Sequence, residues 1–143
     1  GKASDVLKIK SLLLSLSDIT SDMDGLSVRI ALRTDVYEMI RNEEFLQLRE
    51  AYIEIGKMVQ KYGYGQYNGI LRILMGQVNC IDSDESNGEK MKYLIESYSK
   101  LFASRGGLSD FIIYDADVQL RNQLNEKYND EVKRVWNIMK DYI

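Results

Sequence analysis

The helical spacing of apolar residues most constrains the fold of this chain. Between positions 43 and 62, apolar side chains follow one another at intervals of three and four: Phe45, Leu48, Tyr52, Ile55 and Val59. Such intervals place them on one face of an α-helix, which another element must then cover. The sequence contains no proline, so no proline kinks or ends a helix. The pattern predicts an all-α fold.

The same periodicity predicts further helices on both sides of this segment. The predicted ranges are 4–23, 35–41, 43–62, 66–81, 89–102 and 117–142. Glycine-containing or acidic connections separate most of them. Helical seams joined by short loops are typical of an antiparallel bundle. We expect a bundle of about five helices forming one domain over 1–143, with a sub-boundary near residue 42 as an alternative.

The apolar stripes also predict which side chains face the core. The inward face of the 66–81 helix is expected at Tyr67, Leu71, Leu74 and Val78. That of the closing helix is expected at Leu120, Leu124, Tyr128, Val132, Val135 and Met139.

The segment before residue 34 has two interpretations. Apolar residues alternate with polar or small ones from Leu26 to Leu32, as in a half-buried strand. Yet Val28, Leu32 and Val36 also form a stripe at a spacing of four. An isolated strand is unstable and no partner strand is evident, which favours helix. A short strand at 27–33 stays an alternative.

Composition excludes several classes of function. The sequence has no histidine, which removes the commonest general base and metal ligand. Cys80 is the only cysteine, so no intrachain disulfide forms. The net charge of −3 argues against binding nucleic acid through its phosphates. No apolar run approaches the length of a membrane span. We expect a cytoplasmic, non-enzymatic protein with no cofactor and no metal, acting on neither nucleic acid nor membrane.

An acidic connection follows the 66–81 helix. Its carboxylates are Asp82, Asp84, Glu85 and Glu89. A calcium loop would need glycine at position 87 and glutamate at position 93, where the chain has Asn87 and Tyr93. The connection is either a solvated loop or an acidic patch that recognises a basic partner.

Tyrosines gather where the 43–62 helix ends. Tyr64 and Tyr67 lie within five residues of that end, in a sequence with ten tyrosines. Tyrosine is enriched at protein interfaces, although half-buried core edges are the simpler explanation. The expected partner-binding residues are Asp82, Asp84, Glu85, Glu89, Tyr64 and Tyr67.

A glycine pair divides the predicted 89–102 helix from the last one. Gly106 and Gly107 can adopt positive φ and turn the chain sharply. Asp110 can accept hydrogen bonds from nearby backbone amides and so fix the turn. We therefore expect Gly106, Gly107 and Asp110 to have a structural role.

The stretch around this pair, Leu101-Phe-Ala-Ser-Arg-Gly-Gly-Leu-Ser-Asp-Phe-Ile-Ile113, resembles the signature of a family of small, uncharacterised bacterial helical domains. The resemblance covers about residues 46–143. Ser104 and Arg105 replace the small residues of the pattern, and 108–110 keep only its hydrophobic residue and final acid. Some such domains look like immunity proteins, which neutralise a bacterial toxin. The resemblance implies an immunity-type inhibitor that binds another protein.

Two alternatives remain. Residues 28–38 resemble a strand-and-helix segment of bacterial P-loop ATPases, although no phosphate loop precedes them. That resemblance implies a regulatory or scaffolding fragment of a larger protein. A carboxylate-based enzyme would use neighbouring acids, which are more typical of helix surfaces beside Lys or Arg. The acidic candidates are Glu43-Glu44, Glu50 with Glu54, and Asp130-Glu131.

Overall fold

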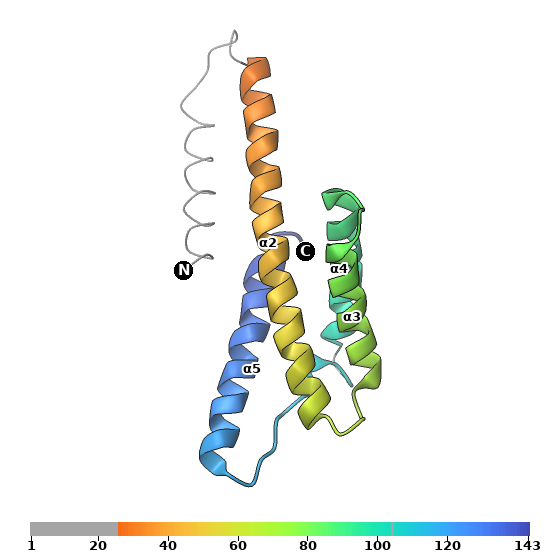
Figure 1. Ribbon diagram of the computed structural model, residues 1–143, viewed down its shortest axis with the longest axis vertical. Helices are drawn as coiled ribbons and strands as arrows, with labels where there is room; N and C mark the ends of the chain where they lie inside the picture. The colour runs from red at the N-terminus through yellow and green to blue at the C-terminus, as the bar shows by residue number, and fades with distance from the viewer. Residues whose placement is uncertain (1–25, 104) are drawn as a thin grey trace. The chain divides into compact units, whose positions relative to one another are not determined.

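The computed structural model describes residues 26–103 and 105–143, with side chains from Asp35 onward. All regular structure in these residues is helical (Figure 1). The elements are α2 (Leu26–Tyr62), α3 (Asn68–Asp82), α4 (Asn87–Leu101), the short 3-10 helix η2 (Leu108–Asp110) and α5 (Val118–Met139). The all-α prediction is confirmed. The helix predicted at 4–23 lies outside the described residues.

The expected number of about five helices is wrong for the described part of the chain, which has four α-helices. The reason is α2, a single helix of 37 residues where two were expected. It includes residues 27–33, so the alternative of a strand there is also wrong. A helix satisfies its backbone hydrogen bonds within its own segment, whereas a strand would need a partner strand.

The chain divides into two compact units, residues 1–47 and 48–143, and the division falls inside α2. In the first unit, the described part of α2 buries the side chains of Ile40, Glu44, Phe45 and Gln47. The second unit contains the end of α2 and every later element.

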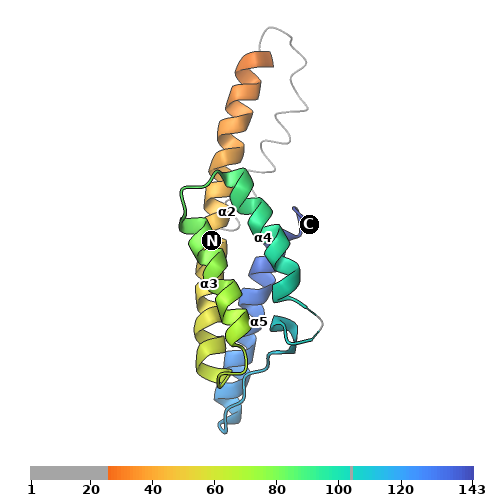
Figure 2. The same ribbon diagram turned by 90° about the vertical axis from the view of Figure 1, so that its right-hand side faces the viewer.

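The second unit is built on one face of α2. That face buries Leu48, Tyr52, Ile55 and Val59, as their spacing predicted. α5 lies alongside this part of α2 and runs in the opposite direction (Figure 1). α3 and α4 form an antiparallel hairpin (Figure 2).

Close approaches join α3 to its neighbours. A Cβ atom on Gly56 of α2 would lie 4.0 Å from the Leu74 side chain of α3. A Cβ on Gly76 of α3 would lie 2.7 Å from the hydroxyl oxygen of Tyr93 on α4. The absence of a side chain at Gly76 therefore lets the Tyr93 hydroxyl lie against the α3 backbone.

The inward faces of the later helices differ in part from those predicted. Of the face predicted for α3, only Leu74 is buried, because the helix is rotated to bury Ile70, Leu74, Gln77 and Ile81. On α5, Tyr128, Val135 and Met139 are buried as predicted, whereas Leu120 is exposed. Two stripes compete on α3, and only the neighbouring helices decide between them.

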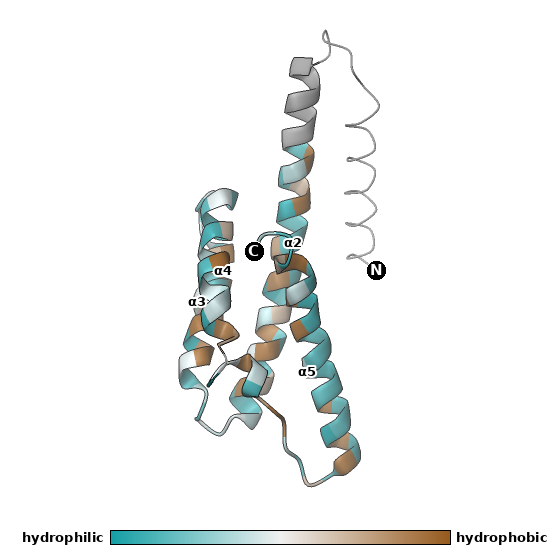
Figure 3. Ribbon diagram, turned by 180° about the vertical axis from the view of Figure 1, so that it is seen from behind, coloured by the Kyte–Doolittle hydropathy of each residue, from teal (hydrophilic) through white to brown (hydrophobic). Residues whose placement is uncertain are grey.

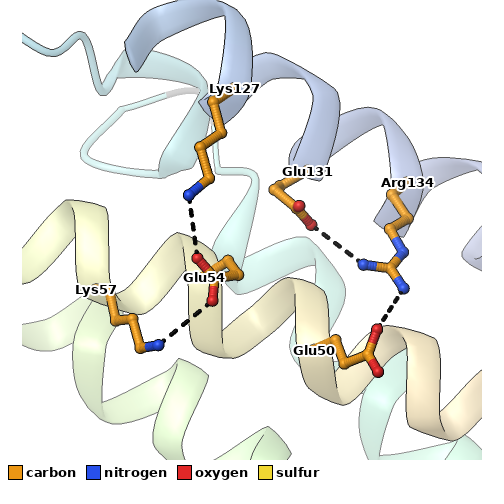
Figure 4. A network of polar contacts seen from close by, with 6 residues as sticks. All are labelled: Glu50, Glu54, Lys57, Lys127, Glu131 and Arg134. Carbon is orange, nitrogen blue, oxygen red and sulfur yellow. Dashed lines mark hydrogen bonds and ion pairs between the residues drawn. The ribbon is translucent and has the colours of Figure 1, made fainter.

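Ion pairs join α2 and α5 beside this core (Figure 4). Arg134 of α5 contacts Glu50 at 2.8 Å and Glu131 at 3.6 Å. Glu54 contacts Lys57 and Lys127, each at 3.3 Å. Burial alone would raise the pKa of Glu54, but the hydrogen bonds from Lys127 and Lys57 outweigh it and hold the pKa below its ordinary value. Exposed pairs contribute at most about 1 kcal/mol each, so the apolar face supplies most of the attachment.

The core contains two polar side chains without a hydrogen-bond partner among the described residues. They are the hydroxyl group of Tyr52 on α2 and the amide group of Gln77 on α3. Burial raises the pKa of Tyr52, and the electrostatic effect of Tyr98 raises it further. The phenol is therefore held neutral in the folded state.

We expect Tyr52 to make stability fall at alkaline pH. The folded pKa lies above the unfolded value of about 10, so the unfolded chain loses this proton first as the pH rises. The contribution is complete below pH ~10 and is lost above it, with a slope near 1.4 kcal/mol per pH unit. Tyr52→Phe should reduce the alkaline slope of the protein by this amount and leave stability at pH 7 unchanged or about 1 kcal/mol higher, because it removes an unpaired hydroxyl.

Urea unfolding at intervals between pH 7 and 12 measures this effect. Tyr64→Phe is the matched control, because it removes an exposed hydroxyl and should leave the profile unchanged. An alkaline slope in Tyr52→Phe equal to that of the parent protein would show that the prediction is wrong.

Candidate partner-binding surface

The carboxylates of the α3–α4 connection do not all have the same surroundings. Asp82 accepts a hydrogen bond from Nε of Arg49 on α2, at 2.8 Å. This hydrogen bond, and the charge of Arg49, lower the pKa of Asp82, while partial burial opposes the shift. Asp82 therefore holds the end of α3 against α2, and its charge is already paired.

The remaining acids form what we call the acidic loop: Asp84, Glu85 and Glu89, all exposed. Ser86 fixes its shape as the N-cap of α4, because its hydroxyl accepts the backbone N–H of Glu89 at 3.3 Å. Glu89 lies in the first turn of α4, where a negative charge is favourable. The acidic loop therefore places three exposed carboxylates around the start of α4.

The two tyrosines of the predicted set differ in the same way. Tyr64 is 75% exposed and adopts a positive φ of 51°, in the turn between α2 and α3. Tyr67 is half-buried, and its ring packs edge-on against Phe111 with 5.1 Å between the centroids. Tyr64 is therefore available to a partner, whereas Tyr67 supports the fold.

The structure does not bring the acidic loop and Tyr64 together. They lie at opposite ends of α3, as Figure 2 shows. A helix of 15 residues is about 22 Å long, which exceeds the reach of a single side-chain cluster. The six predicted residues thus contribute to two separate surfaces.

The glycine turn holds the chain between α4 and η2. Gly106 has a φ of +72°, which an L residue rarely adopts. Its N–H donates to Oδ2 of Asp110 at 2.9 Å. A Cβ on Gly107 would lie 2.6–2.8 Å from backbone atoms of Leu101 and Ala103. Both glycines and Asp110 therefore set the path of the chain into the following segment.

An extended segment, residues 111–115, follows η2 and was missed as a surface by sequence reasoning. Phe111 and Ile113 are buried, whereas Ile112 is 76% exposed and Tyr114 64% exposed. Figure 3 shows this run as a hydrophobic stretch of chain outside the helices. This alternation of buried and exposed side chains is typical of a strand. The sequence could not show it, because four successive apolar residues do not indicate which of them face solvent.

Two side chains of α5 hold this segment. The amide group of Asn125 accepts the Ile113 N–H and donates to the Ile113 carbonyl oxygen, each at 2.9 Å. The hydroxyl of Tyr128 donates to the carbonyl oxygen of Leu108 at 2.7 Å. Burial raises the pKa of Tyr128, and Tyr67 raises it further, so this donor stays protonated. The segment is therefore held at its middle residue and through the 3-10 helix that precedes it.

The exposed apolar side chains continue into α5. We call them the apolar strip: Ile112, Tyr114, Val118 and Leu120. Val118 is 56% exposed and Leu120 39% exposed. Asp117, directly before Val118, caps α5, because its carboxylate accepts the backbone N–H groups of Gln119 and Leu120. Exposed apolar residues that follow one another closely in the sequence in this way mark a candidate interaction surface.

Three other kinds of site can be compared with the described residues: a metal site, a membrane-spanning helix and an acid–base catalytic pair. No group of three or more His, Cys, Asp or Glu there could hold a metal ion. The helices that the structure describes include none with the length and apolarity needed to cross a membrane. Glu50, Glu54 and Glu131, considered above for acid–base chemistry, each contact a lysine or arginine.

Comparison with known proteins found no matching protein family, no matching curated protein and no matching solved structure.

Gly107→Ala tests the close approach at the turn. The added methyl would collide with backbone, so we expect a loss of about 1–3 kcal/mol in the free energy of unfolding. Gly69→Ala is the control, because no atom lies within 4 Å of its Cβ position and helix propensity predicts a gain of up to about 1 kcal/mol. Urea denaturation compares the two. Equal stability of both variants would contradict this account of the turn.

Proposed function

We propose that this chain is a non-enzymatic, cytoplasmic protein-binding domain that acts as an immunity-type inhibitor of a bacterial toxin. The observation that carries protein binding is the apolar strip, whose first two side chains are more than 60% exposed. The toxin as target rests on the resemblance of residues 46–143 to immunity-like domains. A fragment of a signalling ATPase is the alternative, and it rests only on the resemblance of residues 28–38.

The described surface supports a two-part contact. An apolar and aromatic centre with a polar rim is the usual anatomy of a protein interface. Ile112 and Tyr114 offer such a centre, and Asp110 and Asp117 lie close to them in the sequence as polar neighbours. The acidic loop is a separate cluster, suited to attracting a basic protein over a distance before contact.

Growth rescue tests the proposed function. Each protein with toxic activity encoded beside this gene would be produced in a bacterial host, with and without this chain. We expect one of them to be neutralised by the parent protein and to form a complex with it that calorimetry detects. Failure of the chain to bind or neutralise any of them would contradict the immunity proposal.

Tyr114→Glu tests whether the apolar strip makes the contact. A charge buried at an interface centre should weaken the complex at least about 30-fold, which corresponds to 2 kcal/mol or more. Gln123→Glu is the matched control, because it adds the same charge at an exposed position of α5 and should change affinity little. Equal affinity of the two variants would exclude the apolar strip from the interface.

Charge reversal tests the acidic loop. The triple variant Asp84→Lys, Glu85→Lys and Glu89→Lys should slow association with a basic partner about tenfold or more at low salt and weaken its salt dependence. Asp82 is kept, because it pairs with Arg49. Asp130→Lys on α5, which reverses one exposed charge outside the loop, is compared with Asp84→Lys alone as the control for net charge. Stopped-flow kinetics measures both, and unchanged association of the triple variant would remove this surface from the proposal.

A further inference from the structure

We propose that residues 111–115 bind an extended segment of the partner as an added β-strand, and that this segment carries alternating apolar residues flanked by Lys or Arg. The inference rests on the proposed protein-binding function and names the chemistry of the partner. Three properties of the segment carry it: its free backbone edge, the direction of its side chains and the charges around it.

The backbone of the segment is paired on one side only. The side-chain amide of Asn125 accepts a hydrogen bond from the N–H of Ile113 and donates one to its C=O, as a neighbouring strand would. In an extended chain, the backbone groups of adjacent residues point to opposite edges. The backbone N–H and C=O groups of Ile112 and Tyr114 therefore point away from Asn125. Within the described residues neither makes a hydrogen bond, so two donors and two acceptors are open to another strand.

The side chains of the segment favour an apolar occupant. Phe111 and Ile113 face the core, so Ile112 and Tyr114 share the opposite, exposed face. A strand added at the free edge would place every second side chain beside these two. Cross-strand pairs of aromatic and β-branched residues are favourable, which points to residues such as Val, Ile, Phe or Tyr at alternate positions.

The charges around the segment indicate which residues the partner strand carries at its two ends. Asp110, Asp115 and Asp117 flank it and outnumber the nearest cations, which are Arg105 before it and Arg121 on α5, whose guanidinium lies 5.7 Å from the centroid of the Tyr114 ring. The three carboxylates accept backbone N–H groups, and no described cation forms an ion pair with them. Lys or Arg on either side of the apolar residues would complement them.

The same charges disfavour a second copy of this chain as the occupant. Antiparallel pairing of two copies about Ile113 would place Asp115 of one close to Phe111 and Asp110 of the other. Like charges brought together across a strand pair are destabilising. We therefore commit to a basic, extended segment of a different protein.

The segment is already held in the conformation that binding requires. Asn125 holds Ile113, Tyr128 holds Leu108, and the Gly106–Asp110 hydrogen bond closes the preceding turn. A prearranged strand loses little conformational freedom on binding, so main-chain hydrogen bonds contribute more of their energy to affinity.

Peptides provide the first test, and they do not require the natural partner. The probes are capped seven-residue peptides with Lys at both ends, and between them Thr alternates with Val, Ile, Phe or Tyr. Amide NMR of the parent chain is the readout. We expect at least one to bind with its largest shifts at the Ile112 and Tyr114 amides. Replacing Lys by Glu, or N-methylating the amides on the bonding edge, should weaken binding at least tenfold.

A pair of variants tests the free edge in the protein itself. Ile112→Pro removes one edge N–H group, whereas Ile112→Thr keeps it together with a β-branched side chain. We expect Ile112→Pro to lose at least tenfold in affinity for the best peptide, and Ile112→Thr to lose less than threefold. If Ile112→Pro alters amide shifts beyond residues 108–118, the N-methylated peptides with the parent chain decide the question.

Three results would overturn the inference. The first is that no Lys-flanked peptide binds at millimolar concentration. The second is that N-methylated and parent peptides bind equally well. The third is that the chain dimerises with rising concentration and that dimerisation shifts the same two amides. Failure here is distinguishable from failure of the proposed function. A toxin complex unaffected by Ile112→Pro would leave the inhibitor role intact and reject strand addition alone.

Discussion

Every later element of the 48–143 unit depends on the burial of one face of α2. Leu48, Tyr52, Ile55 and Val59 are almost fully removed from solvent. Each large apolar side chain buried in this way contributes roughly 1.5–3 kcal/mol, which far exceeds the contribution of the ion pairs beside it. The face has to be covered by other helices, and α3 and α5 run alongside it.

The position of the apolar strip follows from that packing. α5 is joined to α2 by the ion pairs of Arg134 and Lys127, and it buries Val135 and Met139 in the core. From this fixed helix, Asn125 and Tyr128 reach back to residues 108–113 and hold them. The segment therefore behaves as part of the framework while its outer face stays exposed. Binding residues on a loop held by a rigid scaffold are a common arrangement in proteins.

The candidate residues divide according to whether the fold uses them. Asp82 and Tyr67 were predicted together with Asp84, Glu85, Glu89 and Tyr64, yet each of the first two has a packing or pairing role. Among the described residues, no ion pair or ring contact involves the other four. Asp82 and Asp84 are the same residue type in the same connection, so sequence alone could not separate them, whereas the inward stripe of the 66–81 helix had already included Tyr67. The distinction depends on Arg49 and Phe111, which are distant in the sequence.

The sequence by itself determined that the described chain is helical and which face of α2 is buried over 48–59, because helical periodicity is a local property. It also showed where the chain turns, through Gly106 and Gly107. Only the tertiary structure decided which of two stripes α3 buries and which side of residues 111–114 meets solvent. Those outcomes depend on contacts such as that of Asn125 with Ile113, twelve residues away, and no local pattern records them. The sequence indicated an acidic loop and a tyrosine cluster as candidate surfaces, whereas only the tertiary structure showed the apolar strip.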